Sequence, residues 1–178
     1  VTIWQCRGID FQENHFHHLD KEGVYGIDFS ASFTNVNLFN NLNDGISILS
    51  TSPGASDVEI LGTKIDDDVY ENSFIDNERH IFANGTQLLH GLTVKYNYFE
   101  NAPKGIQINQ KVRFNIEYNE FDTHSTAIDV HSSGSSANFI KCNDITNGCI
   151  GINADGNNSR TKFTSNGFIS YKYDFNMD

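Results

Sequence analysis

The sequence repeats one short pattern seven times, at intervals that are mostly close to 23 residues. Two copies show it most clearly, YNYFENAPKGIQIN at residues 96–109 and YNEFDTHSTAIDVH at residues 118–131. The asparagine of each copy occupies the positions Asn14, Asn37, Asn72, Asn97, Asn119, Asn143 and Asn166. Two positions later, six copies have phenylalanine and one has isoleucine. The unit is too short for a helical repeat or for a four-stranded propeller blade.

Each unit has room for three short segments with alternating apolar residues, which is the content of one coil of a three-stranded solenoid. Equivalent strands of successive coils would pair in parallel, about 4.8 Å apart along the axis. An apolar residue expected to point inward follows the asparagine by nine positions in six copies: Ile46, Ile81, Ile106, Ile128, Ile152 and Phe175. The first copy reaches Ile27 only after four extra residues, the segment DKEG. The pattern predicts an all-β solenoid of about seven coils with stacked phenylalanines and isoleucines inside.

The repeated asparagine has a physical reason at a sharp turn between two strands. An inward amide side chain can accept from one backbone N–H and donate to a carbonyl of the neighbouring coil, which satisfies polar groups that would otherwise be buried unpaired. We therefore expect the asparagines to stack into a ladder. Small residues precede the inward isoleucines, at Gly45, Gly105, Ala127 and Gly151, where we expect the backbone to bend tightly.

The coil pattern N-x-F…G-I-x-I, from about Ile9 to Phe175, resembles that of the right-handed parallel β-helix superfamily. This group includes pectate lyases, alginate epimerases, phage tailspikes and secreted bacterial surface proteins. The resemblance implies a right-handed parallel β-helix for the whole chain. It implies little about function, because the fold carries catalysts, binding modules and inert stalks alike.

We expect residues 1–178 to form a single domain and to be a fragment of a longer chain, because neither end has a polar cap over its open strand edges. One interval is about 12 residues too long, which predicts a loop insertion at about residues 50–68. Loops on a rigid scaffold often carry function. The run Asp66, Asp67 and Asp68 at the end of this loop offers oxygen ligands for Ca²⁺, although a solvated acidic turn explains it as well.

The composition excludes several classes of partner. The formal net charge of −11 would repel nucleic acid, and no apolar run is long enough to span a bilayer. The three cysteines, Cys6, Cys142 and Cys149, cannot all pair within the chain and lack zinc-site spacing. The histidines His15, His17 and His18 have no nearby cysteine or carboxylate at ligand spacing, so we interpret them as surface residues. We expect no cofactor, apart from the possible Ca²⁺ at residues 66–68.

Residues beside the inward isoleucines should point outward and form rows across the coils. One row contains Asp28, Ser47, Phe82, Gln107, Asp129 and Asn153, and the next contains Asn109, His131 and Asp155. The six residues of the last three coils define a polar patch: Gln107, Asn109, Asp129, His131, Asn153 and Asp155. Amide and carboxylate groups match sugar hydroxyls as donors and acceptors, so the patch is a candidate carbohydrate site. An ordinary solvated face explains the same residues.

Asp129 and His131 stand at i and i+2 of one strand and therefore share a face, which suits a base and its orienting carboxylate. The motif is similar to the Asp-x-His element of alginate epimerases, but it lacks their adjoining Tyr-Gly-Phe and their proline. A lyase or epimerase must also neutralise a uronate carboxylate with a cation. Lys104 is the one candidate for this role that the sequence places nearby.

Two further columns are expected to be structural. Lys95, Glu117 and Lys141 occupy equivalent positions in three coils and should pair by charge. Tyr96 and Tyr118, with Tyr98, could present an aromatic surface to sugar rings, but stacked tyrosines also stabilise a parallel ladder.

The sequence therefore favours a secreted or cell-surface bacterial β-helix module. It would act as a rigid scaffold or adhesin-like segment, with glycans and the rest of a larger polypeptide or surface assembly as partners. The alternative is a polysaccharide lyase or epimerase. The alternative requires a cation opposite the base in the patch, and a module does not.

Overall fold

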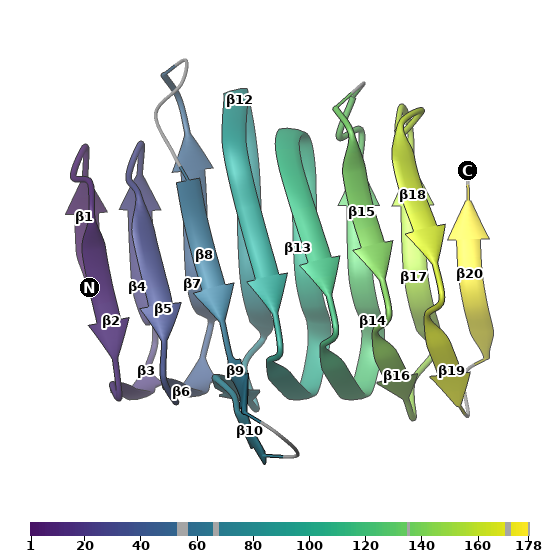
Figure 1. Cartoon of the computed structure of the whole chain (residues 1–178), viewed down its shortest axis with the longest axis horizontal. Helices are drawn as coiled ribbons and strands as arrows, with labels where there is room; N and C mark the ends of the chain where they lie inside the picture. Colours follow the sequence, from purple (N-terminus) through teal and green to yellow (C-terminus); the bar gives the residue numbers. More distant parts are fainter. Residues whose placement is uncertain (53–56, 66–67, 135, 170–171, 178) are drawn as a thin grey trace.

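The computed structural model describes residues 1–52, 57–65, 68–134, 136–169 and 172–177. In this part of the chain every regular element is a β-strand, and the strands wind into a solenoid (Figure 1). Successive coils lie side by side along the long axis, with the first coil in purple at one end and the last in yellow at the other. Equivalent strands pair in parallel. The predicted all-β parallel solenoid is confirmed.

The solenoid has three faces, and each is a sheet of parallel strands. The first face consists of β1 (Thr2–Trp4), β4 (Val24–Ile27), β7 (Asp44–Ser50), β17 (Ile150–Asp155), β20 (Tyr173–Met177) and parts of β12 (Arg79–Lys95), β13 (Tyr98–Glu117) and β14 (Glu120–His131). The second consists of β2 (Ile9–Gln12), β5 (Ala31–Thr34), β8 (Asp57–Leu61), β15 (Asn138–Lys141), β18 (Thr161–Thr164) and the ends of β12 and β13. The third consists of β3 (His15–Leu19), β6 (Leu38–Leu42), β11 (Ser73–Ile75), β16 (Asp144–Thr146), β19 (Gly167–Ile169) and the starts of β13 and β14.

The repeated asparagines stand between the second and third faces and are joined side chain to side chain. Nδ2 of each one donates to Oδ1 of the next, from Asn14 to Asn166, at 2.9 to 3.1 Å. Backbone groups are satisfied as well: Asn119 donates to the carbonyl of Val94 at 3.0 Å and accepts from the N–H of Asn97 at 3.1 Å. The predicted asparagine ladder is confirmed.

The turn that carries the ladder has an unfavourable backbone conformation. Six of the seven ladder asparagines follow a residue whose φ lies between 54° and 59°: Glu13, Val36, Tyr96, Tyr118, Cys142 and Ser165. None of these is glycine, and the left-handed conformation costs other residues roughly 1 to 2 kcal/mol each. The ladder bonds and the packing beneath them must therefore stabilise a backbone that these residues do not favour by themselves.

The interior is filled by columns of identical side chains. Five phenylalanine rings stack with centroids 4.6 to 4.9 Å apart: Phe16, Phe39, Phe74, Phe99 and Phe121. The inward isoleucines of five coils are fully buried: Ile46, Ile81, Ile106, Ile128 and Ile152. The predicted phenylalanine and isoleucine stacks are confirmed. Burial of a side chain of this size contributes about 1.5 to 3 kcal/mol, which makes these columns the main source of stability.

The first coil differs from its predicted alignment. Val24, and not Ile27, pairs with Ile46, and it is fully buried. Tyr25 therefore takes the outward position that we expected for Asp28. Asp28 is buried in the following corner instead. The alignment was wrong because the excursion before β4 adds fewer residues to the coil than the sequence pattern suggested.

The small residues before the inward isoleucines serve a different purpose from the one we expected. None of Gly45, Gly105 and Gly151 has a positive φ, so the backbone conformation does not require glycine there. A Cβ on Gly45 would lie 2.6 Å from the carbonyl oxygen of His80, and one on Gly151 would lie 2.5 Å from the ring of Phe168. Close approach to the neighbouring coil, and not a tight bend, is the reason for the small residue.

The insertion expected at residues 50–68 is interrupted by a regular strand. β8 pairs with β5 on one side and β12 on the other, so Asp57–Leu61 belongs to the second face. The extra residues are divided between the segment before β8 and an antiparallel hairpin of β9 (Thr63–Ile65) and β10 (Asp68–Tyr70). Figure 1 shows this hairpin projecting from the side of the solenoid.

Removal of one ladder side chain should destabilise the whole stack. We expect Asn119→Ala to lower the free energy of unfolding by about 1 to 3 kcal/mol, because buried donors and acceptors on both neighbouring coils lose their partners. The neighbouring Glu120 is exposed, so Glu120→Ala is the control. Equal midpoints of the two variants in a urea titration would contradict an inward ladder.

Two buried histidines should make the fold sensitive to acid. His80 and His124 lie in the interior with ring centroids 5.1 Å apart. Burial lowers the pKa of His80 well below its usual value, and burial lowers the pKa of His124 to about 4 despite the opposing charge of Asp122. The unfolded chain therefore binds more protons than the folded chain as the pH falls from about 6.5 to about 4. Stability should fall across this range, by at most about 1.4 kcal/mol per pH unit for each histidine.

The variant His124→Leu tests the source of this pH dependence. It removes the titrating ring, and it should flatten the decline of the unfolding free energy between about pH 6.5 and about pH 4. The exposed His17 provides the control His17→Leu. The buried-histidine explanation fails if both variants change the decline equally in denaturation curves recorded across this pH range.

Candidate functional site

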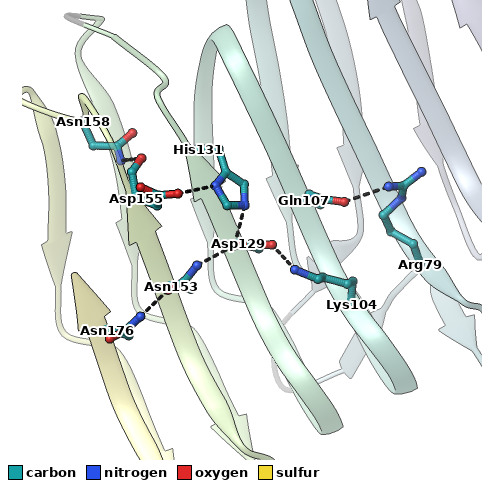
Figure 2. A network of polar contacts seen from close by, with 9 residues as sticks. All are labelled: Arg79, Lys104, Gln107, Asp129, His131, Asn153, Asp155, Asn158 and Asn176. Carbon is teal, nitrogen blue, oxygen red and sulfur yellow. Dashed lines mark hydrogen bonds and ion pairs between the residues drawn. The ribbon is translucent and has the colours of Figure 1, made fainter. Parts of the chain in front are cut away.

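The polar patch predicted from the sequence lies on the outer side of the first face (Figure 2). The pairing of β13, β14 and β17 places its six residues in two rows, one of Gln107, Asp129 and Asn153 and one of Asn109, His131 and Asp155. The structure therefore brings all six together. Most of them are half-buried, Asp155 is exposed, and Asp129 is fully buried.

Asp129 is the centre of the patch. It forms an ion pair with Lys104 of the preceding coil, accepts a hydrogen bond from Nδ2 of Asn153 at 2.8 Å, and lies 3.1 Å from Nε2 of His131. Burial alone would raise the pKa of Asp129, but the hydrogen bonds from Asn153 and Lys104 and the charge of Lys104 outweigh it and lower the pKa. Asp129 is therefore a carboxylate that holds one side chain from each of three neighbouring strand segments.

The burial of Asp129 corrects one expectation from the sequence. Its place in an outward row led us to expect that its side chain is exposed to solvent. Asp129 does point outward, but the side chains around it cover it completely. Loss of this carboxylate should therefore affect stability as well as the patch.

His131 stands between two carboxylates. Its Nε2 lies 3.1 Å from Oδ1 of Asp129, and its Nδ1 lies 3.1 Å from Oδ2 of Asp155. A ring with both nitrogens directed at acceptors has no nitrogen free to remove a proton from a substrate. Asp155 in turn accepts a hydrogen bond from Asn158 through its backbone carbonyl at 2.8 Å.

A second cation, Arg79, lies at the edge of the patch and was not predicted from the sequence. Arg79 forms a two-pronged ion pair with Asp44 at 2.8 and 2.9 Å, and its Nη1 donates to Oε1 of Gln107 at 2.7 Å. Its guanidinium carbon lies 3.8 Å from the ring centroid of Phe82. Arg79 pairs in register with Lys104, so the column that contains Lys104 would have revealed it.

The other predicted columns occur as expected. Glu117 lies 3.2 Å from the ammonium groups of both Lys95 and Lys141. Burial alone would raise the pKa of Glu117, but the hydrogen bonds from the two lysines outweigh it and lower the pKa. The rings of Tyr96 and Tyr118 stack with centroids 5.3 Å apart.

Tyr98 does not take part in this stack of tyrosines. Burial and the nearby carboxylate of Glu100 raise the pKa of Tyr98 to about 12, so its hydroxyl stays protonated at neutral pH. The aromatic surface expected from three tyrosines is therefore built from Tyr96 and Tyr118.

The remaining candidates do not form a site among the described residues. His15, His17 and His18 are exposed on β3, and Nδ1 of His17 lies 2.9 Å from Nδ1 of His18. No group of metal-ligating side chains is found in the part of the chain that the structure describes. Asp66 and Asp67 lie outside the described residues, as does the side chain of Asp68.

Two further findings concern the cysteines and membrane-spanning helices. Cys6, Cys142 and Cys149 are free thiols. Within the described ranges, no helix has the length and apolar character to cross a membrane.

Comparison with known proteins gives the family. The sequence profile described as "Right handed beta helix region" matches residues 1–168. The chain belongs to the right-handed β-helix family. No curated protein and no solved structure is significantly similar to this β-helix. The family assignment explains the fold, whereas the chemistry of this β-helix has to be derived from its own residues.

A pair of variants distinguishes the roles of Lys104 and Asp129 in this β-helix. Lys104→Met leaves a buried carboxylate without its cation and should lower the unfolding free energy by about 1 to 3 kcal/mol near neutral pH. Asp129→Asn removes the buried charge and should cost less. Burial would then raise the pKa of Asp129 in the Met variant, so this variant should recover part of its deficit as the pH falls.

Urea titrations of both variants at about pH 7 and about pH 4.5 measure this difference. The ion-pair interpretation predicts that the gap between Lys104→Met and Asp129→Asn narrows at the lower pH. A gap of the same size at both pH values would contradict it.

Proposed function

We propose that this chain is a rigid β-helix module of an extracellular or cell-surface protein, and that it binds a glycan on the outer side of β13, β14 and β17. The observation that carries the proposal is the network around Asp129, which fixes side chains from three adjacent strand segments (Figure 2). A site whose polar groups are already ordered loses less entropy when it binds a ligand.

The chemistry of the patch suits sugar hydroxyls. Gln107, Asn109 and Asn153 offer amide groups that both donate and accept, and the exposed carboxylate of Asp155 accepts from hydroxyls. At one edge, the ring of Phe82 lies beneath the guanidinium of Arg79 and adds a small apolar surface. Alternating amide, carboxylate and aromatic groups are typical of sites for neutral or weakly charged saccharides.

The scaffold role is supported by the continuity of the coil stack. The ladder joins seven coils without a break, and the aromatic column beneath it has no gap between Phe16 and Phe121. Such a stack holds residues of distant coils at fixed spacing, as an adhesin-like segment requires. The extracellular location follows from the resemblance to secreted β-helix proteins and is part of the proposal.

A polysaccharide lyase or epimerase is the second candidate. Two cations border the patch, Lys104 and Arg79, and a uronate carboxylate would need one of them. Both cations are already paired with aspartates, however, and both ring nitrogens of His131 face carboxylates. Asp129 is covered and cannot contact a substrate. These contacts favour binding over proton abstraction.

The binding proposal is tested with the variant His131→Ala/Asp155→Ala. Both side chains are partly exposed, at 34% and 53%, so their removal should leave the thermal melting curve nearly unchanged. We expect this variant to lose retention on a glycan array that retains the unaltered chain. The row of Asn109, His131 and Asp155 then has only one of its three polar side chains left. Glu120→Ala, an exposed change on the third face, should bind as the unaltered chain does.

The same protein samples decide the question of catalysis. Incubation with polyuronates should produce neither unsaturated sugar ends that absorb in the ultraviolet nor a changed epimer ratio by NMR. Turnover that disappears in His131→Ala/Asp155→Ala would overturn the binding-module proposal in favour of an enzyme. Equal glycan retention by this variant and by Glu120→Ala would refute the patch as the binding site.

A further inference from the structure

A second candidate site lies on the outer side of the second face, away from the polar patch. A groove of about 680 Å³ crosses β8, β12, β13 and β15 there and ends at Arg160, just before β18. Its lining includes Thr93 and Asn115, together with the aromatic ring of Phe139. These three residues form one outward row, because Thr93 pairs with Asn115 and Asn115 pairs with Phe139.

The groove exists because small residues interrupt the wall of side chains. Gly91 and Ala137 line it where neighbouring coils carry Asp57, Arg113 and Arg160. A Cβ on Gly91 would lie 2.8 Å from Oδ1 of Asp57, so a larger residue there would displace this carboxylate and narrow the hollow. The hollow is therefore formed by the backbone and short side chains of the sheet, with Asp57 at one end, Arg113 between the two small residues and Arg160 at the other end.

The charges of the groove are separated along its length. Arg113 lies in the middle of the groove and Arg160 at its carboxyl-terminal end, where Lys162 stands 5.8 Å from the ring centroid of Phe139. Asp57 lies at the opposite end, and it also lines an adjoining hollow together with Asp10 and Glu59. The groove thus has a cationic end and an acidic end.

Two exposed arginines lie in the groove, although the chain as a whole is acidic. It has a net charge of −11, and Arg113 and Arg160 are exposed. Neither forms an ion pair with any residue in the described part of the chain, whereas Arg79 is held by Asp44. Arg113 lies on β13 and Arg160 directly precedes β18, and β15 lies between these two strands. Their backbones are therefore roughly 10 Å apart, a distance that two long side chains can close around one ligand. Guanidinium groups recognise carboxylate and sulfate through paired hydrogen bonds.

We propose that this groove binds a short acidic oligosaccharide, with its carboxylate or sulfate group between Arg113 and Arg160. The neutral hydroxyls extend over Thr93 and Asn115, and a sugar ring packs against Phe139. Asp57 and Glu59 repel a further acidic group at the other end. This charge separation favours a short ligand with an acidic end and excludes long polyanions such as nucleic acid.

Binding of defined oligosaccharides tests the proposal directly. Isothermal titration uses three probes of equal length: cellotetraose with its terminal sugar oxidised to a glucuronate, cellotetraose sulfated once on its terminal sugar, and neutral cellotetraose. We expect at least one acidic probe to bind the full chain and cellotetraose to bind much more weakly. The variants Arg113→Gln and Arg160→Gln should each weaken acidic binding by about tenfold or more, because each removes a charge-assisted hydrogen bond.

The control is Arg7→Gln, which makes the same charge change at an exposed arginine outside the groove. It should bind the acidic probes as the unaltered chain does. Melting curves identify any variant that fails to fold, and the two arginines give independent tests if one of them does. Absence of acidic binding, equal binding of cellotetraose, or equal loss in Arg7→Gln would each overturn the proposal.

The outcome is separable from that for the polar patch. His131→Ala/Asp155→Ala changes the first face and should leave binding in the groove intact. Loss of acidic binding in this variant, with retention in Arg113→Gln and Arg160→Gln, would assign the acidic ligand to the patch and refute the groove.

Discussion

The hydrogen bonds between ladder asparagines are the interaction on which the rest of this molecule depends. Each amide joins two coils and satisfies backbone groups at a corner, and six of the seven asparagines follow a left-handed residue, such as Tyr96 or Tyr118. Because this corner fixes the register of successive coils, the inward phenylalanines of successive coils stack on one another, and the isoleucines stack in the same way. The outward rows align for the same reason, so both candidate sites consist of residues separated by one coil of sequence.

The same alignment decides the electrostatics of the surface. Charged residues that stack on a parallel sheet either repel or pair, and this chain pairs them between coils, as Glu117 does with Lys95 and Lys141. Asp129 is the extreme case, because neighbouring side chains bury it completely although it points away from the core. Its network orders the patch, but it also occupies the groups that catalysis would need. The groove of the second face differs, because Arg113 and Arg160 have no such ion pairs among the described residues.

The sequence predicts those features that the repeat encodes once in each coil. Asn119 and Phe121 have equivalents in every copy, so the ladder, the aromatic column and the rows of the patch could be read from spacing. The first coil could not, because one or two residues added at a corner leave several alignments open, and Asp28 was therefore given the place of Tyr25. The repeat pattern could not predict the burial of Asp129 either, because this burial depends on how far the long side chains of adjacent coils extend over it. Arg79 was missed because the outward rows predicted for the patch contain only positions that follow each inward isoleucine, whereas Arg79 stands two positions before Ile81, in the column of Lys104.

The direction of the ladder bonds has a consequence for how such a protein can change in evolution. Every interior asparagine donates to the next coil and accepts from the previous one, so all coil junctions in the ladder are chemically alike. Duplication or deletion of one whole unit rejoins asparagine to asparagine and leaves the other junctions unaltered. The length of the molecule can therefore vary in steps of about 4.8 Å without redesign of the core. Insertion or deletion of part of a unit would shift the asparagines out of register. Such a change is tolerated only where the extra residues project from the solenoid, as the β9–β10 hairpin does.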